Sequence, residues 1–245
     1  MSSISKKIKF VSLIVFLSLF TAILLFTQSR LELPVFSTDD GPRAVYKGNN
    51  GIALTFNIGW GDTKAEPIIQ LLEKNNVKEA TFFLSGAWAE RHPDLTKKIQ
   101  ELGFEIGILG YDYVNYSEVE TGEIRKDIGK AQEVFTKLGV KEISLVRAPT
   151  GHFNKATIDT VDQLGFTLVH WSINSHDWTN PGVENIVHNV QHAANGDILL
   201  FHASDSAKQT KDALPVILKG LENKGEFVSV SDLINAGKVK TKLVP

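Results

Sequence analysis

The chain has no cysteine among its 245 residues, and it has no long basic run. The lack of cysteine excludes disulfide bonds, thiolate metal ligands and thiol nucleophiles. The formal net charge is −2 at pH 7, so nothing in the charge balance predicts binding to nucleic acid. Any chemistry must therefore come from histidine, carboxylate, hydroxyl and amide side chains.

One long apolar run stands out near the N-terminus, from Phe10 to Phe26. Its length of about 17 residues is at the lower end of what spans a bilayer, and the lysines before it predict a cytoplasmic N-terminal side. A cleaved signal peptide is the alternative, although no small-residue cleavage site follows the run. We expect a cytoplasmic segment at 1–9, a transmembrane signal anchor at 10–26 and an extracytoplasmic tether at 27–46, which places the rest of the chain outside the cell membrane.

After Gly51, short β-branched or aromatic runs alternate with longer amphipathic segments, a pattern typical of repeated βα units. The expected strands are Ile52–Phe56, Ala80–Leu84, Phe104–Ile108, Ile143–Val146, Thr167–Trp171, Asp197–Phe201 and Glu226–Val230. The expected helices are Lys64–Lys74, Ala87–Leu102, Glu118–Leu138, Lys155–Leu164, Gly182–Ala193 and Ser206–Asn223. Seven strands with six intervening helices predict an α/β fold, a distorted seven-stranded (β/α) barrel over residues 47–245.

Polar and aromatic motifs follow several of these strands, where barrel proteins build their sites. The motifs are Thr55-Phe56-Asn57-Ile58-Gly59, Arg147-Ala148-Pro149-Thr150-Gly151, Asn174-Ser175-His176-Asp177-Trp178 and Leu200-Phe201-His202. In this order and at this spacing they resemble the motifs of the polysaccharide deacetylase (NodB-homology) family of metal-dependent enzymes. The resemblance covers nearly all of the chain after Lys47 and also implies a seven-stranded barrel.

The resemblance implies catalytic roles for several of these residues. His202 matches the general acid of the family, Asp177 matches the residue that orients this histidine, and Arg147 matches the arginine that pairs with the base. The general base itself is an aspartate in the family, and here Asn57 occupies that position. An amide forms hydrogen bonds but does not take up a proton at neutral pH, so the base is missing.

The metal ligands that the resemblance implies are also replaced. The family holds a divalent metal such as zinc with an aspartate and two histidines, and these positions fall on Ile58, Leu109 and Tyr113. Isoleucine and leucine have no lone pair, and a phenol with a reference pKa near 10 is a poor anionic ligand at neutral pH. We therefore expect no metal ligands here and no cofactor.

A relocated metal site is the alternative, because carboxylate and imidazole groups elsewhere on the same loops suit several divalent ions. The candidate ligands are Asp62, Asp112, His176 and Asp177. This alternative also needs a new general base.

Aromatic and polar residues at the strand ends predict a sugar-binding pocket, because sugar faces stack on aromatic rings. Ordinary packing of loop aromatics is the competing interpretation. The candidate substrate-binding residues are Trp60, Tyr111, Asn174, Trp178 and Leu200.

Three functions remain open from the sequence. The first is a membrane-anchored, deacetylase-like protein of the envelope or spore that binds peptidoglycan-type glycan and has lost hydrolysis. The second is an active peptidoglycan or chitin N-deacetylase with a relocated metal. The third is a structural or partner-binding envelope protein with a vestigial pocket. The motifs after Asp177 and His202 look most like the sporulation-associated branch of the family in bacilli.

Overall fold

The structure is a computed structural model that describes residues 16–21, 37–38, 41–235 and 240–242. Contacts divide the chain into two units, residues 1–35 and 36–245. In the first unit, residues 16–21 form a helix, and most of the expected anchor at 10–26 lies outside the described residues. Within the described ranges, no helix is long and apolar enough to cross a membrane.

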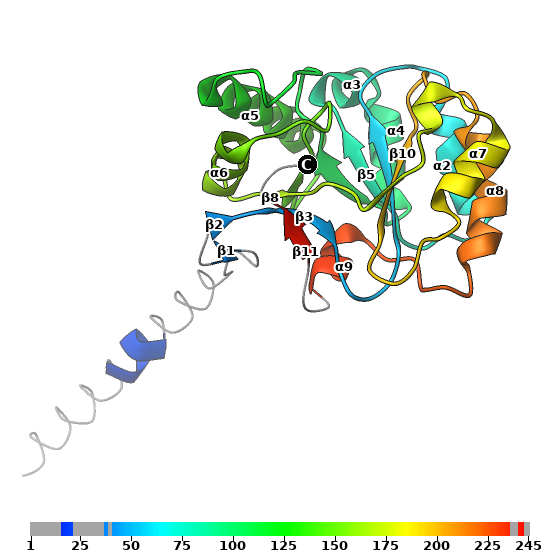
Figure 1. Cartoon of the computed structure of the whole chain (residues 1–245). Coiled ribbons are helices and arrows are strands. Elements are labelled where there is room, and N and C mark those ends of the chain that lie inside the picture. The colour runs from blue at the N-terminus through cyan, green and yellow to red at the C-terminus, as the bar shows by residue number, and fades with distance from the viewer. Residues whose placement is uncertain (1–15, 22–36, 39–40, 236–239, 243–245) are drawn as a thin grey trace, which may run out of the picture. The chain divides into compact units, whose positions relative to one another are not determined.

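The second unit is built on a sheet of seven parallel strands (Figure 1). The strands are β4 (Ala53–Ile58), β5 (Thr81–Leu84), β6 (Glu105–Ile108), β7 (Leu145–Val146), β8 (Thr167–Leu168), β9 (Ile173–Asn174) and β10 (Ile198–His202). Their order is β8-β7-β6-β5-β4-β10-β9. Every residue of the central strand β4 is buried, as expected where both faces of a parallel sheet are covered.

The register of the central strands sets the position of the site. On β10, His202 pairs with Asn57 of β4, and on the other side Asn57 pairs with Phe83 of β5. Because all three strands run in the same direction, their carboxyl ends meet at one end of the sheet. Asn57 and His202 therefore lie next to each other at that end.

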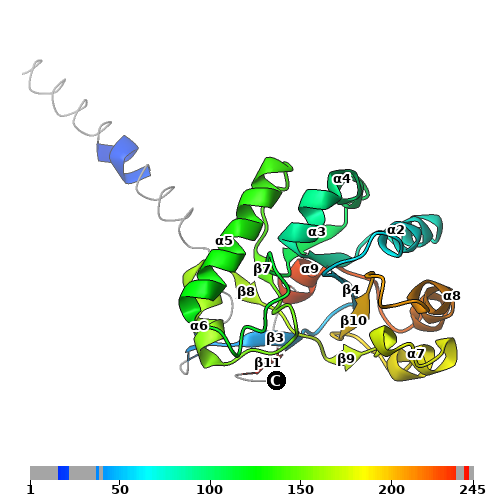
Figure 2. The same cartoon turned by 90° about the horizontal axis from the view of Figure 1, so that it is seen from above.

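Helices cover the outer side of the curved sheet, which is best seen from above (Figure 2). They are α2 (Ala65–Lys74), α3 (Gly86–Arg91), α4 (Pro93–Glu101), α5 (Thr121–Lys137), α6 (Lys155–Gln163), α7 (Val183–Val190) and α8 (Thr210–Leu221). The expected helix at 87–102 is split into α3 and α4 at Pro93, because proline has no N–H to continue the first helix and suits the first turn of the next.

The two faces of β4 pack against different parts of the protein. Phe56 and Ile58 belong to the apolar cluster between sheet and helices, whereas Thr55 and Asn57 point to the concave side, where both accept hydrogen bonds from Arg147. A smaller cluster on the concave side includes α9 (Val230–Asn235), whose Val230 N–H donates to Thr81 at the start of β5. Helix α9 therefore closes the amino-terminal end of the barrel and leaves the carboxyl end for the site.

The structure confirms an α/β fold with seven parallel strands and corrects three details. The expected strand at 226–230 is wrong: Phe227 forms only an isolated bridge to Ile52, and Val230 begins α9. The seventh strand is β9 instead. No pairing joins β8 to β9 among the described strands, so the sheet is a curled half-barrel rather than a closed barrel.

Two further short pairings lie near the N-terminal edge of this unit. Strand β3 (Ala44–Lys47), which includes residues 44–46 of the expected tether, pairs with β11 (Lys240–Lys242). Just before it, β1 (Ser37–Thr38) pairs with β2 (Gly41–Pro42).

Candidate functional site

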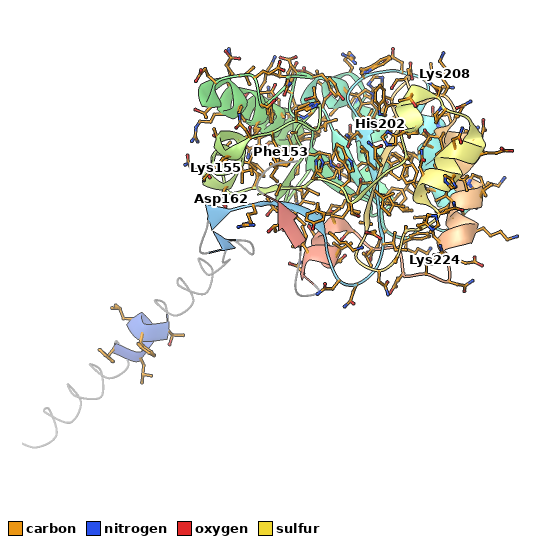
Figure 3. All side chains as sticks on the ribbon, in the orientation of Figure 1. Phe153, Lys155, Asp162, His202, Lys208 and Lys224 are labelled. Carbon is orange, nitrogen blue, oxygen red and sulfur yellow. The ribbon has the colours of Figure 1, made fainter. Side chains whose placement is uncertain are left out.

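A pocket of about 580 Å³ opens at the carboxyl ends of the strands. Figure 3 labels His202 there, near the upper rim of the domain. The loops after β4, β6, β7, β8, β9 and β10 all contribute to its wall. The lining residues are Asn57, Gly59, Trp60, Tyr113, Pro149, Thr150, Gly151, His152, His170, Trp171, Asn174, Trp178, Leu200, His202, Ser204 and Ser206.

Asn57 forms the floor of this pocket, and Arg147 lies directly behind it. Arg147 Nη1 donates to Asn57 Oδ1 at 2.9 Å and to Thr55 Oγ1 at 2.8 Å, and Nη2 donates to the carbonyl oxygen of His170 at 3.0 Å. Asn57 is only 4% exposed but still lines the pocket. The arginine has no exposed surface, so it acts on the pocket through Asn57.

The Arg147 guanidinium lacks an acidic partner. Its hydrogen bonds go to an amide, a hydroxyl and backbone carbonyls, and it lies 3.9 Å above the ring of Phe83. Among the residues that the structure describes, no carboxylate forms an ion pair with it. Burial lowers the pKa of Arg147 well below its usual value, because the cation loses its hydration and gains no counter-charge.

His202 is held by Asp177 on the other side of the pocket. The Asp177 carboxylate accepts from His202 Nδ1 at 2.8 Å, from the backbone N–H of His202 at 2.7 Å and from Thr210 Oγ1 at 2.7 Å. The aspartate is completely buried, and His202 lines the pocket. The bond to Nδ1 leaves the Nε2 atom of His202 as the ring nitrogen that is not tied to the aspartate.

Three large aromatic side chains form an exposed rim around the pocket. Trp60, Tyr113 and Trp178 line it and are 50%, 52% and 52% exposed, respectively. Deeper in the wall, Trp171 stacks on His170 with ring centroids 3.7 Å apart. Exposed rings beside a polar floor are the combination that binds a sugar ring.

The rim residue Trp178 lies on a rigid loop. It lies in the short 3₁₀ helix Asp177–Thr179, which is flanked by His176 and Asn180, both with a left-handed backbone at φ 54°. Asn180 donates from its amide nitrogen to the Ser206 carbonyl and accepts from the Lys208 N–H. Such backbone is uncommon for residues other than glycine and persists only where surrounding contacts fix it.

Asp205 fixes the loop that carries Trp60. Its carboxylate accepts from the backbone N–H groups of Asp62, Thr63 and Lys64, and from Thr63 Oγ1, at 2.9–3.1 Å. Desolvation acts to raise the pKa of Asp205, but these four hydrogen bonds favour the anion more strongly, so the pKa is lowered.

The structure brings most of the expected site residues together. Asn57, Trp60, Asn174, Trp178, Leu200 and His202 line one pocket, with Arg147 and Asp177 directly behind the wall. Tyr111 is the exception, because it does not line this pocket. Its hydroxyl donates to Glu90 at 2.8 Å and Lys130 lies over its ring, because Asp127 accepts its backbone N–H and holds this part of the loop against α5.

Sequence reasoning missed several lining residues. His152 and His170 are the main ones, together with Trp171 and the hydroxyl residues Thr150, Ser204 and Ser206. His152 directly follows the Arg147–Gly151 motif, which was the available signal. His170 and Trp171 were expected as the tail of a strand, but β8 ends at Leu168 and the chain then turns along the pocket.

The four candidate ligands for a relocated metal do not come together. Asp62 pairs with His92 at 2.9 Å on the surface, and Asp177 is buried behind His202. Neither Asp112 nor His176 lines the pocket. Across the described residues, no group of three or more histidine, cysteine, aspartate or glutamate side chains is arranged to hold a metal ion.

Comparisons with known proteins agree on one family. The polysaccharide deacetylase profile matches residues 44–169. A peptidoglycan-N-acetylglucosamine deacetylase from Bacillus cereus is 38% identical over 188 residues, which cover 75% of this chain and 87% of the relative. The crystal structure of a peptidoglycan N-acetylglucosamine deacetylase aligns with a TM-score of 0.76 at 27% identity, over 86% of this chain and 99% of the other.

A further structural neighbour is a CE4 family pseudoenzyme from Bacillus anthracis. It aligns with a TM-score of 0.72 at 25% identity, over 79% of this chain and 69% of its own. A mutant of the same pseudoenzyme has restored enzymatic activity.

These matches contradict the expectation that this protein has no cofactor. The family to which the matched enzymes belong is metal-dependent, so a divalent metal is the cofactor to expect. The residues that the sequence resemblance assigns to the ligand positions nevertheless do not fit one. Ile58 and Leu109 are fully buried and apolar, and burial raises the pKa of Tyr113, which disfavours the phenolate.

Proposed function

Because this chain belongs to the polysaccharide deacetylase family, we propose that it is an envelope protein whose pocket binds N-acetylated glycan of the peptidoglycan type without hydrolysing it by the family reaction. The proposal combines two features of one pocket. Exposed aromatic rings that suit a sugar line the pocket, and an amide stands at the position that the resemblance assigns to the general base.

The observation that carries the proposal is the hydrogen bond between Arg147 and Asn57. An arginine side chain only donates hydrogen bonds, so the atom of Asn57 at 2.9 Å from Nη1 is its amide oxygen. This bond occupies the oxygen and leaves the NH₂ group for the pocket. Neither atom can accept a proton from water at neutral pH, so residue 57 does not act as a general base.

The rest of the pocket suits binding. Trp60, Tyr113 and Trp178 offer half-exposed rings for the faces of sugar units, and Asp177 fixes His202 so that its Nε2 atom meets a polar group of the ligand. Their loops are tied by side-chain hydrogen bonds before any ligand arrives. A preorganised site loses little conformational entropy on binding.

The place of action that we propose is the outer face of the cell membrane or the spore envelope. The support is the apolar run at residues 10–26 with lysines on its N-terminal side, together with relatives that act on peptidoglycan. Extraction of cell membranes at alkaline pH tests the anchor: the full-length chain should stay with the membrane pellet, and release into the supernatant would contradict anchoring.

The central experiment measures binding and turnover on the same preparation. We expect the full-length chain to bind chitotetraose or soluble peptidoglycan glycan strands, and to release no acetate from them, with or without added zinc. Titration calorimetry and an acetate assay provide the two readouts. Binding without acetate supports the proposal, and the absence of glycan binding contradicts it and favours a partner-binding role.

An active deacetylase is the second candidate. The hydrogen bond of 2.8 Å between Asp177 and His202 favours it, because the general-acid half of the family site is in place. Acetate release that depends on an added divalent metal and is lost in His202→Ala would establish this candidate and overturn the first.

A further inference from the structure

We infer that the floor of the pocket is a carboxylate-binding site and that it makes the pocket select acidic sugars over neutral ones. The inference rests on the proposed glycan-binding function and adds to it the chemical class of the preferred ligand.

The first observation is the polarity of Asn57. Its amide oxygen is used by Arg147, and among the described residues no protein group accepts a hydrogen bond from its Nδ2 atom. The side chain is almost fully buried, yet it lines the cavity, so the two N–H groups are directed into it. An aspartate at this position would present a negative acceptor. Asn57 presents hydrogen-bond donors instead, so the ligand group that fits is an acceptor rather than a donor.

The second observation is the buried charge behind Asn57. Arg147 is fully buried and its partners are the neutral groups of Thr55, Asn57 and two backbone carbonyls. A buried cation without a counter-ion produces a positive potential that is weakly screened, and an anion in the adjacent pocket lowers its energy. The Arg147 charge reaches a ligand through one amide group, since Asn57 lies between them.

The third observation is the charge of the pocket wall. Within the described part of the chain, the lining residues include neither aspartate nor glutamate, and they include the three imidazoles of His152, His170 and His202. Two carboxylates stand close behind the lining, and both already accept hydrogen bonds: Asp177 behind His202 accepts three, and Asp205 accepts four from residues 62–64. An anion therefore meets N–H donors on the floor and no exposed negative charge on the wall.

A carboxylate is an anion that this floor suits, because its oxygen can accept a hydrogen bond from the Asn57 amide while the buried Arg147 charge lies behind that amide. Within a peptidoglycan-type glycan, an acidic sugar carries such a group on an ether side chain, and the half-exposed rings of Trp60 and Trp178 would hold its ring. A small free acid such as acetate offers the same chemistry without the sugar.

The test compares N-acetylmuramic acid with N-acetylglucosamine, a pair that differs by one carboxylate-bearing ether group, and includes sodium acetate as a third ligand. Titration of the full-length chain should give binding of the acidic sugar tighter by about tenfold or more, the gain typical of a charged hydrogen bond. In Asn57→Asp this preference should disappear, because the ligand would meet a negative acceptor. Asn57→Ala, which lacks the donor without adding charge, should retain only part of the preference.

The outcomes separate the two proposals. Equal binding of the acidic and the neutral sugar overturns the carboxylate site and leaves the glycan-binding function standing. Acetate binding that depends on Asn57, without binding of either sugar, supports the carboxylate site and contradicts glycan binding. If none of the three ligands binds, both proposals are wrong. Melting curves of each variant show whether a loss of binding reflects a loss of folding.

Discussion

Arg147 donates from Nη1 to the amide oxygen of Asn57 at 2.9 Å, with the guanidinium completely buried and the amide on the pocket floor. This pair joins the interior of the domain to the pocket. Arg147 matches the arginine that the resemblance pairs with a base, and the residue that it contacts here is a neutral amide. Stability and, in the two proposals above, glycan binding and ligand choice therefore depend on the same two side chains.

We expect Asn57→Asp to stabilise the protein at neutral pH. The new carboxylate would give Arg147 a counter-charge at hydrogen-bonding distance, which we expect to add about 1–3 kcal/mol to the free energy of unfolding. For a domain of this size, each kcal/mol corresponds to about 2–4 °C in Tm. Differential scanning calorimetry at pH 7 measures the change, and a lower Tm than that of the parent would contradict the account of Arg147.

The pH dependence provides a control for this prediction. The new carboxyl group should have its pKa lowered by the neighbouring cation, so its stabilising contribution is present above the unfolded pKa of about 3.9 and is lost as the pH falls through the folded pKa. Asn57→Ala, which removes the acceptor and adds nothing, should be less stable than the parent at every pH between 5 and 8, as roughly 1–3 kcal/mol is lost when a buried donor is unpaired.

The rim aromatics provide a matched pair of variants for glycan binding. Trp178→Ala should weaken binding of chitotetraose about 5- to 30-fold, because a half-exposed stacking surface is removed from the pocket mouth. Tyr111→Ala, also an aromatic residue of a strand-end loop, should leave binding unchanged, because Tyr111 contacts Glu90 and Lys130 outside the pocket. Titration calorimetry compares the two, and an equal loss in both variants would contradict the assignment of the rim.

The fold was largely predictable where long apolar runs define the strands. Strand β4 is buried over its length and β10 up to its last residue, His202, and both fall within a residue or two of the expected ranges. Strand β9 was not predictable, because two residues, Ile173 and Asn174, form it only by pairing with Leu199 and Leu200. The segment at Glu226–Val230 has the composition of a strand. It does not form one, because Glu105 accepts a hydrogen bond from the N–H of Val230 and helix α9 begins at that residue.

The site was predictable to the extent that strand ends determine it. Parallel register alone brings His202 next to Asn57, and Asp177 reaches His202 because its loop follows the edge strand β9. The loop after β6 was not predictable in the same way. Tyr111 and Tyr113 are two residues apart, yet Asp127 holds the first against α5 and the second lies beside Gly59 in the pocket. No periodicity in the sequence encodes that difference.

Asp205→Asn should loosen the Trp60 loop and change the acid stability of the protein. The pKa of Asp205 is lowered, so its contribution exists above the unfolded value near 3.9 and disappears as the pH falls through the lower folded value. The side chain is partly exposed, and solvent screening reduces the expected cost at pH 7 to about 0.5–1 kcal/mol. The difference between the parent and the variant should start to shrink near the unfolded value and should close only below the lower folded pKa. Urea unfolding of the parent and the variant at pH 7 and at low pH measures the difference in their free energies of unfolding. The same difference at both pH values would contradict the prediction.

The last prediction concerns restoration of the family's metal site. Asn57→Asp, Ile58→Asp, Leu109→His and Tyr113→His together should increase zinc affinity over that of the parent, because the barrel fixes the backbone from which these side chains project. A neighbour with the same fold supports the approach, since a mutant of that pseudoenzyme has restored enzymatic activity. Ile58 is the most costly of the four positions to change, because its side chain packs between the sheet and the helices. Ile58→Asp alone should lower the free energy of unfolding by about 2–5 kcal/mol and should not add zinc affinity. That single variant is the control, and calorimetric titration with zinc is the measurement. If the fourfold variant folds and binds zinc no better than the parent, these four positions do not converge on one site, and the assignment of Ile58, Leu109 and Tyr113 to the ligand positions is wrong.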